Sequence, residues 1–265
     1  MLWLEGIGCS RNGNEVLDGV TFGVSSGELV VIEGSPASGK STLLEVAATV
    51  RQPERGAAWF AGRNTTTLQK TSLPFVRRNI GYYVAEALLI EEDTALANVM
   101  AALAVRGEQL AAAEEGARGA LGLVRAGDLA NRQVASLSSG QKRMVALART
   151  LAGPPPLVVA DEPAALLGDE ARAVVVAALA AARDAGSAVL VATADSALAN
   201  ALVAASGRRI HIADGRVVGA PAVELVPEPS LAEEEKDRET IRLVTLETDD
   251  DIEVVLMPSS SKGPR

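Results

Sequence analysis

The chain has 265 residues, of which 48% are hydrophobic and 22% are charged, and its formal net charge is −9. This length and apolar content suit one large α/β domain or two small ones, and they exclude a wholly disordered chain. The acidic balance argues against nucleic acid as a partner, because proteins that bind nucleic acid normally present a basic face.

Cysteine content, apolar runs and the first residues bear on the compartment of the chain. Cys9 is the only cysteine, which excludes an internal disulfide. No apolar run reaches the roughly 18 residues that a membrane-spanning helix needs. Residues 1–5 lack the basic and apolar character of a secretory signal. We therefore expect a cytoplasmic chain that reaches a membrane only through a partner.

Short aliphatic runs alternate with helical stretches along residues 1–220. The runs are too short for helices and end at polar residues, so they predict buried strands of a parallel sheet with covering helices. Asp214-Gly215 predicts the turn of a late hairpin. The strands are expected at residues 29–32, 157–160 and 188–191, the helices at 40–50, 170–185 and 196–205, and an Ala/Leu-rich helical insert at about 86–155.

The segment after the first of these strands fits the pattern G-x-x-x-x-G-K-[ST]. It follows a predicted strand and opens a predicted helix, which is the setting of a phosphate-binding loop rather than of a chance match. Backbone amides and the helix N-terminus would surround the phosphates, Lys40 would reach the β- and γ-phosphates, and the Ser41 hydroxyl would bind Mg²⁺. The expected phosphate-binding residues are Gly34, Ser35, Pro36, Ala37, Ser38, Gly39, Lys40, Ser41 and Thr42.

A second Ser/Gly turn precedes a helix that we expect at residues 142–151. A serine before a helix is by default an N-cap, so capping alone explains this turn when it is considered in isolation. It consists of Leu137, Ser138, Ser139, Gly140 and Gln141.

The strand predicted at residues 157–160 ends in two acidic residues, Asp161 and Glu162. In proteins with a phosphate loop, an acid at this point holds Mg²⁺, so Asp161 is the candidate metal ligand. Glu162 is the candidate general base that polarises the attacking water. The alternative is that both acids merely favour the start of the next helix, but a phosphate loop in the same chain makes the metal-binding interpretation stronger.

Acidic residues are concentrated in the last part of the chain. Residues 221–265 hold twelve of the 34 acids and five of the 25 bases, which indicates a boundary near residue 220. Three prolines and a run of three glutamates in this part predict a linker. The β-branched stretches beyond it leave two interpretations open, a small acidic β-hairpin or a solvated tail.

The order of these motifs resembles the nucleotide-binding subunits of ATP-binding cassette (ABC) proteins over about residues 2–219. Residues 73–81 and 94–99 look like the corresponding stretches of the subgroup that holds FtsE, LolD and MacB, and residues 73–78 look most like FtsE. The resemblance implies an α/β fold of the phosphate-loop NTPase class, with a mostly parallel core sheet, a small antiparallel β part and the helical insert.

The resemblance also implies a mechanism and partners. Two subunits, identical or different, would pack head to tail, and ATP with Mg²⁺ would lie between one subunit's phosphate loop and the other's turn. Ser138 and Gly140 would then donate to the γ-phosphate of ATP on the second subunit, with Ser139 and Gln141 beside them. The pair would drive a membrane permease-like partner at the inner face of the cell membrane.

Two side chains that the family uses near the γ-phosphate are missing. After the strand that begins at Ile80 the family has a glutamine, where this chain has Ala85; Glu86 follows and would have to act after a one-residue shift. Ala194 stands where the family places a histidine. The single histidine, His211, falls in the predicted late hairpin, where a structural or exposed role is expected.

Three further positions depart from the family pattern. The aspartate that usually follows Glu162 by six residues is Gly168, and Asp169 is one place out of register. Ser139 replaces the first glycine of the turn, and its Cβ limits how closely the backbone of the turn can approach a phosphate. Arg11 occupies the place of an adenine-stacking aromatic, and its planar guanidinium offers a flat surface for a base.

These departures favour two hypotheses about activity. The groups that bind triphosphate, metal and water remain, whereas those that sense the γ-phosphate are missing, so we predict an ATPase that is slow or dependent on its partner. The alternative is a regulatory or sensor subunit that binds ATP with little turnover. A small-molecule kinase is disfavoured by the turn at residues 137–141.

Overall fold

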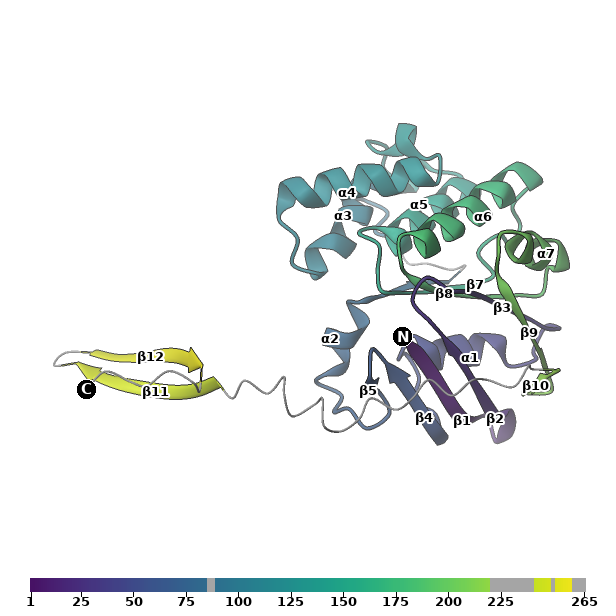
Figure 1. Ribbon diagram of the computed structural model, residues 1–265. Coiled ribbons are helices and arrows are strands. Elements are labelled where there is room, and N and C mark those ends of the chain that lie inside the picture. Colours follow the sequence, from purple (N-terminus) through teal and green to yellow (C-terminus); the bar gives the residue numbers. More distant parts are fainter. Residues whose placement is uncertain (85–88, 220–240, 249–250, 259–265) are drawn as a thin grey trace. The chain divides into compact units, whose positions relative to one another are not determined.

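The computed structural model describes residues 1–84, 89–219, 241–248 and 251–258 (Figure 1). Two compact units divide the chain, Met1–Glu224 and Leu225–Arg265. Within the described residues, no helix is both long enough and apolar enough to cross a membrane. The first unit contains every residue that the sequence identifies as a candidate site residue.

A six-stranded sheet forms the centre of the first unit, in the order β10-β9-β3-β8-β7-β6. The strands from β9 to β6 are parallel, and β10 closes the edge as an antiparallel hairpin with β9. The strands are β3 (Leu29–Glu33), β6 (Ile80–Tyr83), β7 (Leu157–Asp161), β8 (Ala188–Thr193), β9 (Arg208–Ala213) and β10 (Arg216–Val218).

Helices cover both faces of this sheet, which explains why its central strands are aliphatic throughout. In Figure 1, α1 lies on one face, and α5, α6 and α7 lie on the other. Side chains of β3 alternate accordingly: Val30 and Ile32 pack into the core with α1, and Leu29 and Val31 into the core with α5 to α7. The helices are α1 (Lys40–Ala47), α2 (Leu73–Arg77), α3 (Ala95–Val105), α4 (Leu110–Leu123), α5 (Ser139–Leu151), α6 (Asp169–Asp184) and α7 (Ser196–Ala204).

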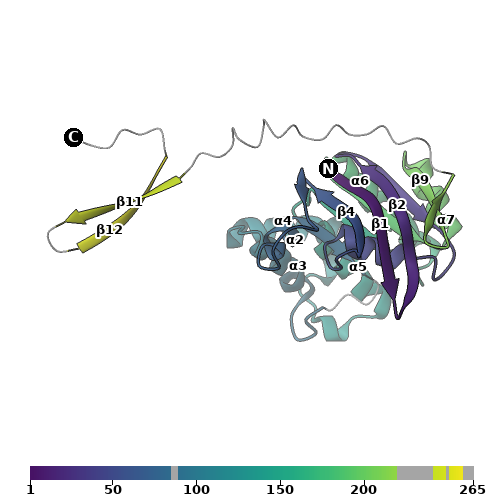
Figure 2. The same cartoon turned by 90° about the horizontal axis from the view of Figure 1, so that it is seen from below.

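A four-stranded antiparallel sheet, β2-β1-β4-β5, shares its core with α1. Figure 2 shows its long strands side by side. Irregular registers interrupt β1 after Leu4, Ile7 and Cys9, so its apolar residues do not follow a simple alternation. These strands were therefore expected only through the family resemblance. They are β1 (Leu2–Arg11), β2 (Asn14–Val24), β4 (Arg55–Phe60) and β5 (Arg63–Asn64).

The Ala/Leu-rich stretch forms helices, as predicted. Small alanines and leucines of α3, α4 and α5 pack closely, with Leu103, Ala117, Leu121 and Leu147 buried in one core. Two short 3₁₀ turns, Gly127–Leu129 and Val134–Ser136, lead into α5. That helix begins at Ser139 rather than at residue 142, so part of the predicted turn forms its first helical turn.

The fold class that the sequence predicts is confirmed. The predicted parallel strands appear as β3, β7 and β8, and the late hairpin appears as β9 and β10 with Asp214-Gly215 at its turn. In the second unit, β11 (Ile241–Thr248) and β12 (Asp251–Pro258) pair antiparallel, which is the arrangement of a hairpin. Residues 220–240, where the linker was predicted, lie outside the described residues.

Candidate nucleotide-binding site

The loop between β3 and α1 has the backbone of an anion-binding loop. Gly39 adopts a φ of 98°, and a Cβ there would lie 2.6 Å from the carbonyl oxygen of Val16. A Cβ on Gly34 would collide with the carbonyl oxygen of Ile212. Both ends of the loop therefore require glycine, and its crest at Ser35, Pro36 and Ala37 is exposed.

The Lys40 side chain is folded into this loop. It is 6% exposed, and its ammonium donates to the carbonyl oxygens of Gly34 and Ser35, each at 2.8 Å. An ammonium has three donors, so one remains for a ligand. In the described part of the chain, the buried Ser38 hydroxyl has no hydrogen-bond partner, and no side chain caps α1. Positive charge and unused donors thus converge at a helix N-terminus, which is where phosphate binds.

Asp161 and Ser41 form a fitting pair for Mg²⁺. Burial raises the pKa of Asp161, and the hydrogen bond from Ser41 and the charge of Lys40 oppose that shift. Among the described residues, Asp161 Oδ1 is buried without a hydrogen-bond partner. A buried carboxylate oxygen with no donor, next to a hydroxyl, suits a cation that takes its remaining ligands from phosphate and water.

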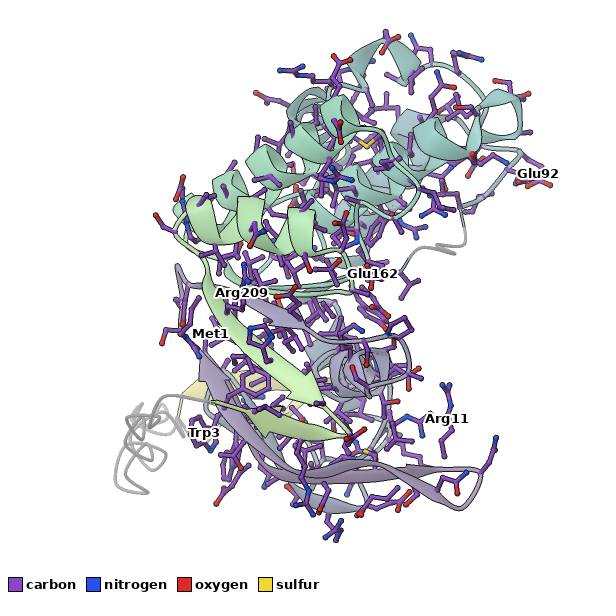
Figure 3. The ribbon with its side chains drawn as sticks, turned by 90° about the vertical axis from the view of Figure 1, so that its right-hand side faces the viewer. Met1, Trp3, Arg11, Glu92, Glu162 and Arg209 are labelled. Carbon is purple, nitrogen blue, oxygen red and sulfur yellow. The ribbon has the colours of Figure 1, made fainter. Side chains whose placement is uncertain are left out.

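Glu162 follows β7 and has a φ of 48°, a conformation unusual for a residue other than glycine. Its amide donates to the carbonyl oxygen of Ala192 on β8 at 2.9 Å, which ties the turn after β7 to the neighbouring parallel strand. Figure 3 shows its side chain at the centre of the molecule, between the sheet and the helices. The candidate base and the candidate metal ligand are thus adjacent at the carboxyl end of β7.

The Ser138 turn is an N-cap in this subunit. The Ser138 hydroxyl accepts from the Gln141 amide at 3.3 Å, and the Gln141 side chain accepts from the Ser138 amide at 3.0 Å. The capping role that the sequence suggested by default is therefore present. Ser138 and Ser139 are exposed, and a Cβ on Gly140 would meet only the Leu167 side chain, at 3.8 Å. The turn is thus open to a second molecule.

Arg11 lies at the end of β1 and is 58% exposed on its side chain. Its guanidinium is 3.9 Å from the carboxylate of Glu45, on the helix that the phosphate loop opens. Figure 3 shows it projecting outward from the sheet. This position, beside α1, is compatible with contact to the base of a nucleotide held at the loop.

The positions that depart from the family pattern differ in their surroundings. Ala194 is exposed directly after β8, and Gly168 is the N-cap of α6. Asp169 is exposed and pairs with Arg172 at 2.7 Å. The His211 side chain is 56% exposed, and its Nδ1 lies 3.9 Å from the Glu33 carboxylate on the neighbouring strand. Ala85 and Glu86 lie outside the described residues.

Two residues at the site have no counterpart in the sequence interpretation. Thr193 is buried, and its hydroxyl donates to Glu162 Oε2 at 2.8 Å. Burial, with the nearby charges of Asp161 and Glu45, raises the pKa of Tyr82 to about 12, so Tyr82 is a neutral neighbour of the candidate metal ligand. The signal for Thr193 was its place directly before Ala194; Tyr82 gave none.

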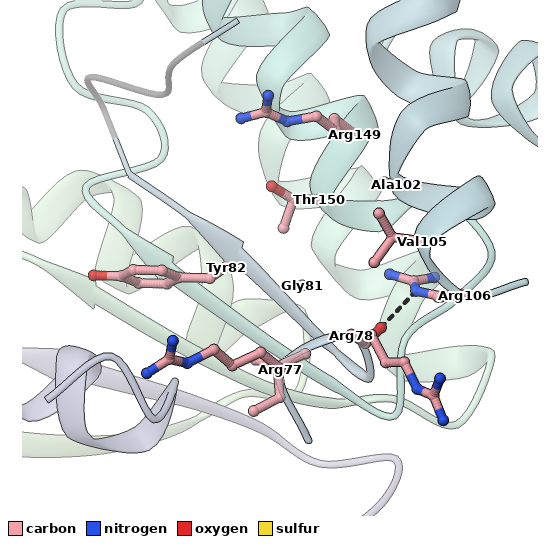
Figure 4. A pocket seen from close by; sticks show the side chains of 10 residues that line it. Arg77, Arg78, Gly81, Tyr82, Ala102, Val105, Arg106, Arg149 and Thr150 are labelled. Carbon is pink, nitrogen blue, oxygen red and sulfur yellow. Dashed lines mark hydrogen bonds between the residues drawn. The ribbon is translucent and has the colours of Figure 1, made fainter. Parts of the chain in front are cut away.

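A pocket of about 240 Å³ lies between α2, β6, α3 and α5 (Figure 4). Arg106 donates to the carbonyl oxygens of Arg78 at 2.9 Å and Gly153 at 2.6 Å. Burial lowers the pKa of Arg106 and of Arg149. None of the lining residues is acidic; they are Arg77, Arg78, Ile80, Gly81, Tyr82, Ala102, Val105, Arg106, Arg149 and Thr150.

Comparison with known proteins places these features in a family. The ABC transporter family model matches residues 17–165. The chain is 33% identical over 157 residues to the cell division ATP-binding protein FtsE of Escherichia coli (strain K12), covering 59% of this chain and 71% of that protein. It is 34% identical over 168 residues to the lipoprotein-releasing system ATP-binding protein LolD of Bacteroides thetaiotaomicron, covering 63% and 77% respectively.

Solved structures agree. A dimeric bacterial ABC transporter cassette superposes with a TM-score of 0.75 and 28% identity, covering 82% of this chain and 96% of that one. A dimeric post-hydrolysis state of an ATP-binding cassette bound to ADP and Pi gives a TM-score of 0.74 at 28% identity, with the same coverage. The resemblance inferred from the motifs, including its FtsE- and LolD-like character, is confirmed, and the chain belongs to the ABC transporter family.

Proposed function

We propose that this chain is the ATP-binding subunit of a membrane complex, and that it binds and slowly hydrolyses ATP at a head-to-tail dimer interface. The observation that carries the proposal is the convergence of the Lys40 loop, Asp161 and Glu162 at the carboxyl ends of β3 and β7. Nucleotides bind at such strand ends in open α/β sheets.

Each residue then has a separate task. Lys40 and the amides of residues 34–42 hold the phosphates, and Ser41 and Asp161 would hold Mg²⁺. When bound, Mg²⁺ neutralises charge on the phosphate oxygens. Glu162 accepts a proton from water, whose oxygen attacks the γ-phosphorus while the bond to ADP breaks. The Arg11 guanidinium lies against the adenine base of ATP.

The second subunit completes the site in this proposal. Ser138 uses its oxygen as an acceptor for the Gln141 amide, so its hydroxyl proton stays available for a phosphate of the other subunit. The amides of Ser139 and Gly140 are at the N-terminus of α5 and add donors there. Support comes from the two dimeric structures of one similar cassette.

Missing side chains set the expected rate. Ala194 and Gly168 offer no side chain that could contact the γ-phosphate or link the two subunits. Loss of one contact made mainly in the transition state costs about 10²–10³ in rate. We therefore expect slow turnover that the membrane partner stimulates. A sensor subunit without turnover is the second candidate, favoured by the same two positions and opposed by the retained Glu162.

Removal of metal tests the hydrolytic proposal. The purified subunit, alone and with its membrane partner, should release phosphate from ATP in the presence of Mg²⁺ and lose this activity in excess EDTA. Without the cation, the carboxylate of Asp161 adds negative charge beside the triphosphate and the hydroxyl of Ser41 carries none to offset it. Restoring Mg²⁺ should restore the rate. Release that is equally fast with EDTA would contradict a role of Asp161 and Ser41 in metal binding.

We further propose that the membrane partner docks at the arginine-lined pocket. Two of its arginines, Arg77 and Arg78, are exposed, and none of its lining residues is acidic, although the chain as a whole carries a charge of −9. Phe75 is 62% exposed, with the guanidinium carbon of the lining residue Arg78 5.2 Å from its ring centroid. Arginine beside an exposed aromatic is typical of protein interfaces. We expect a partner segment that combines acidic and apolar residues.

Charge reversal at Arg78 tests this docking surface. The Arg78 side chain is exposed, and only its backbone carbonyl is engaged by Arg106, so Arg78→Glu should leave the fold and ATP binding intact. We expect partner affinity to fall by about tenfold or more, because a like charge would then face the partner's acids. The control is Arg118→Glu on α4, a position that is also exposed and does not line the pocket. Equal affinity of both variants would place the docking surface elsewhere.

A further inference from the structure

The Glu162 carboxylate is held at both oxygens by the last residue of β8, Thr193, and by the residue that follows it, Ala194. The Thr193 hydroxyl donates to Oε2 at 2.8 Å, and the Ala194 amide donates to Oε1 at 2.6 Å. Thr193 is fully buried. A carboxylate oxygen has two lone pairs, so each still has one free. The two contacts therefore orient the group without exhausting its capacity to accept a proton.

The Thr193 hydroxyl is itself fixed in direction. It accepts from the Asp195 amide at 3.0 Å, so its own proton points to Glu162. Asp195 caps α7 by accepting from the Ala197 amide at 2.8 Å and pairs with Arg172 at 3.2 Å. The loop between β8 and α7 is thus tied to two helices, and the hydroxyl does not depend on a mobile neighbour.

We infer that Thr193 is a positioning residue for the candidate base: its hydroxyl sets the orientation in which Glu162 meets the attacking water. The inference rests on the proposed ATPase function and adds a residue to its machinery. The Ala194 side chain cannot contact a ligand in this chain. The groups that this segment offers to Glu162 are therefore the Thr193 hydroxyl and the Ala194 backbone amide. A purely structural hydroxyl would affect stability but not the chemical step.

Removal of the hydroxyl with preserved shape tests the inference in the full chain with its membrane partner. Thr193→Val should lower kcat about tenfold, because a misoriented base loses proximity, and should leave KM and Mg-ATP affinity unchanged. Thr193→Ser should retain wild-type kcat. The control is Thr65→Val, since Thr65 is also buried and donates one hydrogen bond, to Ala58. An unchanged kcat in Thr193→Val, or a parallel loss in Thr65→Val, overturns the inference.

Hydrogen exchange of the Ala194 amide gives a second readout that needs no turnover. Ala194 is exposed, so its amide should owe its protection to Glu162. In Thr193→Val the carboxylate loses one anchor, and exchange at Ala194 should rise about tenfold, with no change in Thr193→Ser or Thr65→Val. Unchanged exchange overturns the inference. If wild type shows no turnover that depends on Glu162, the proposed ATPase fails, and the exchange rates still decide whether Thr193 holds Glu162.

Discussion

Replacing Lys40 by alanine should abolish nucleotide-induced dimerisation. The Lys40 ammonium is buried inside the phosphate loop, and the phosphate-facing donor that remains on it is charged. A charged hydrogen bond contributes about 1.5–3 kcal/mol, and several phosphate oxygens share this cation, so we expect Mg-ATP affinity to fall on the order of 100-fold. Light scattering with millimolar Mg-ATP should show dimers of wild type and monomers of Lys40→Ala.

Lys70→Ala is the matched control, since Lys70 is exposed in the segment before α2. Thermal unfolding without nucleotide should show that Lys40→Ala is folded, because the loop carbonyl oxygens that Lys40 contacts can turn to water. Dimers of Lys40→Ala at the wild-type ATP concentration would show that the nucleotide does not join the subunits at this loop.

Glu162→Gln should reduce ATP turnover by about 10²–10⁴, the range that a positioned general base contributes. Glutamine keeps the size of the side chain, but its single carbonyl oxygen can accept only one of the two hydrogen bonds that Thr193 and Ala194 donate to Glu162, and its amide cannot take a proton from water. Nucleotide binding should persist, and ATP-bound dimers should last longer because the step that separates them is blocked. Phosphate release and dimer lifetime measure the two effects.

Glu170→Gln provides the control for this variant, since Glu170 is an exposed acid of α6 whose carboxylate lies 3.8 Å from the exposed Arg125 guanidinium. Its turnover should equal that of wild type. Equal background in wild type and Glu162→Gln, with tight ATP binding in both, would remove hydrolysis from the account and favour the sensor subunit.

Local features of the sequence carried most of the fold prediction. Aliphatic runs of four residues at β3, β7 and β8 are buried on both sides of the sheet, so composition alone identifies them. The phosphate loop is also local, because all of its residues lie between one strand and one helix. β1 was less predictable, since its irregular pairing at Leu4, Ile7 and Cys9 breaks the two-residue period.

Contacts between distant segments account for what the sequence could not predict. Thr193 and Glu162 are 31 positions apart, and only the parallel pairing of β7 with β8 brings them together. The pocket likewise combines residues of α2, β6, α3 and α5. The departures at Gly168 and Ala194 were visible in the sequence, whereas the amide contact of Ala194 with Glu162 depends on backbone direction, which no residue type encodes.

Calorimetric titration of the intact chain with Mg-ATP tests the central claim, that the loop from Gly34 to Thr42 binds a nucleoside triphosphate. We expect a saturable heat at one site per subunit, which disappears in Lys40→Ala and persists in Lys70→Ala. Absence of heat from the wild-type chain at millimolar Mg-ATP would contradict the claim, together with the dimerisation and hydrolysis that depend on it.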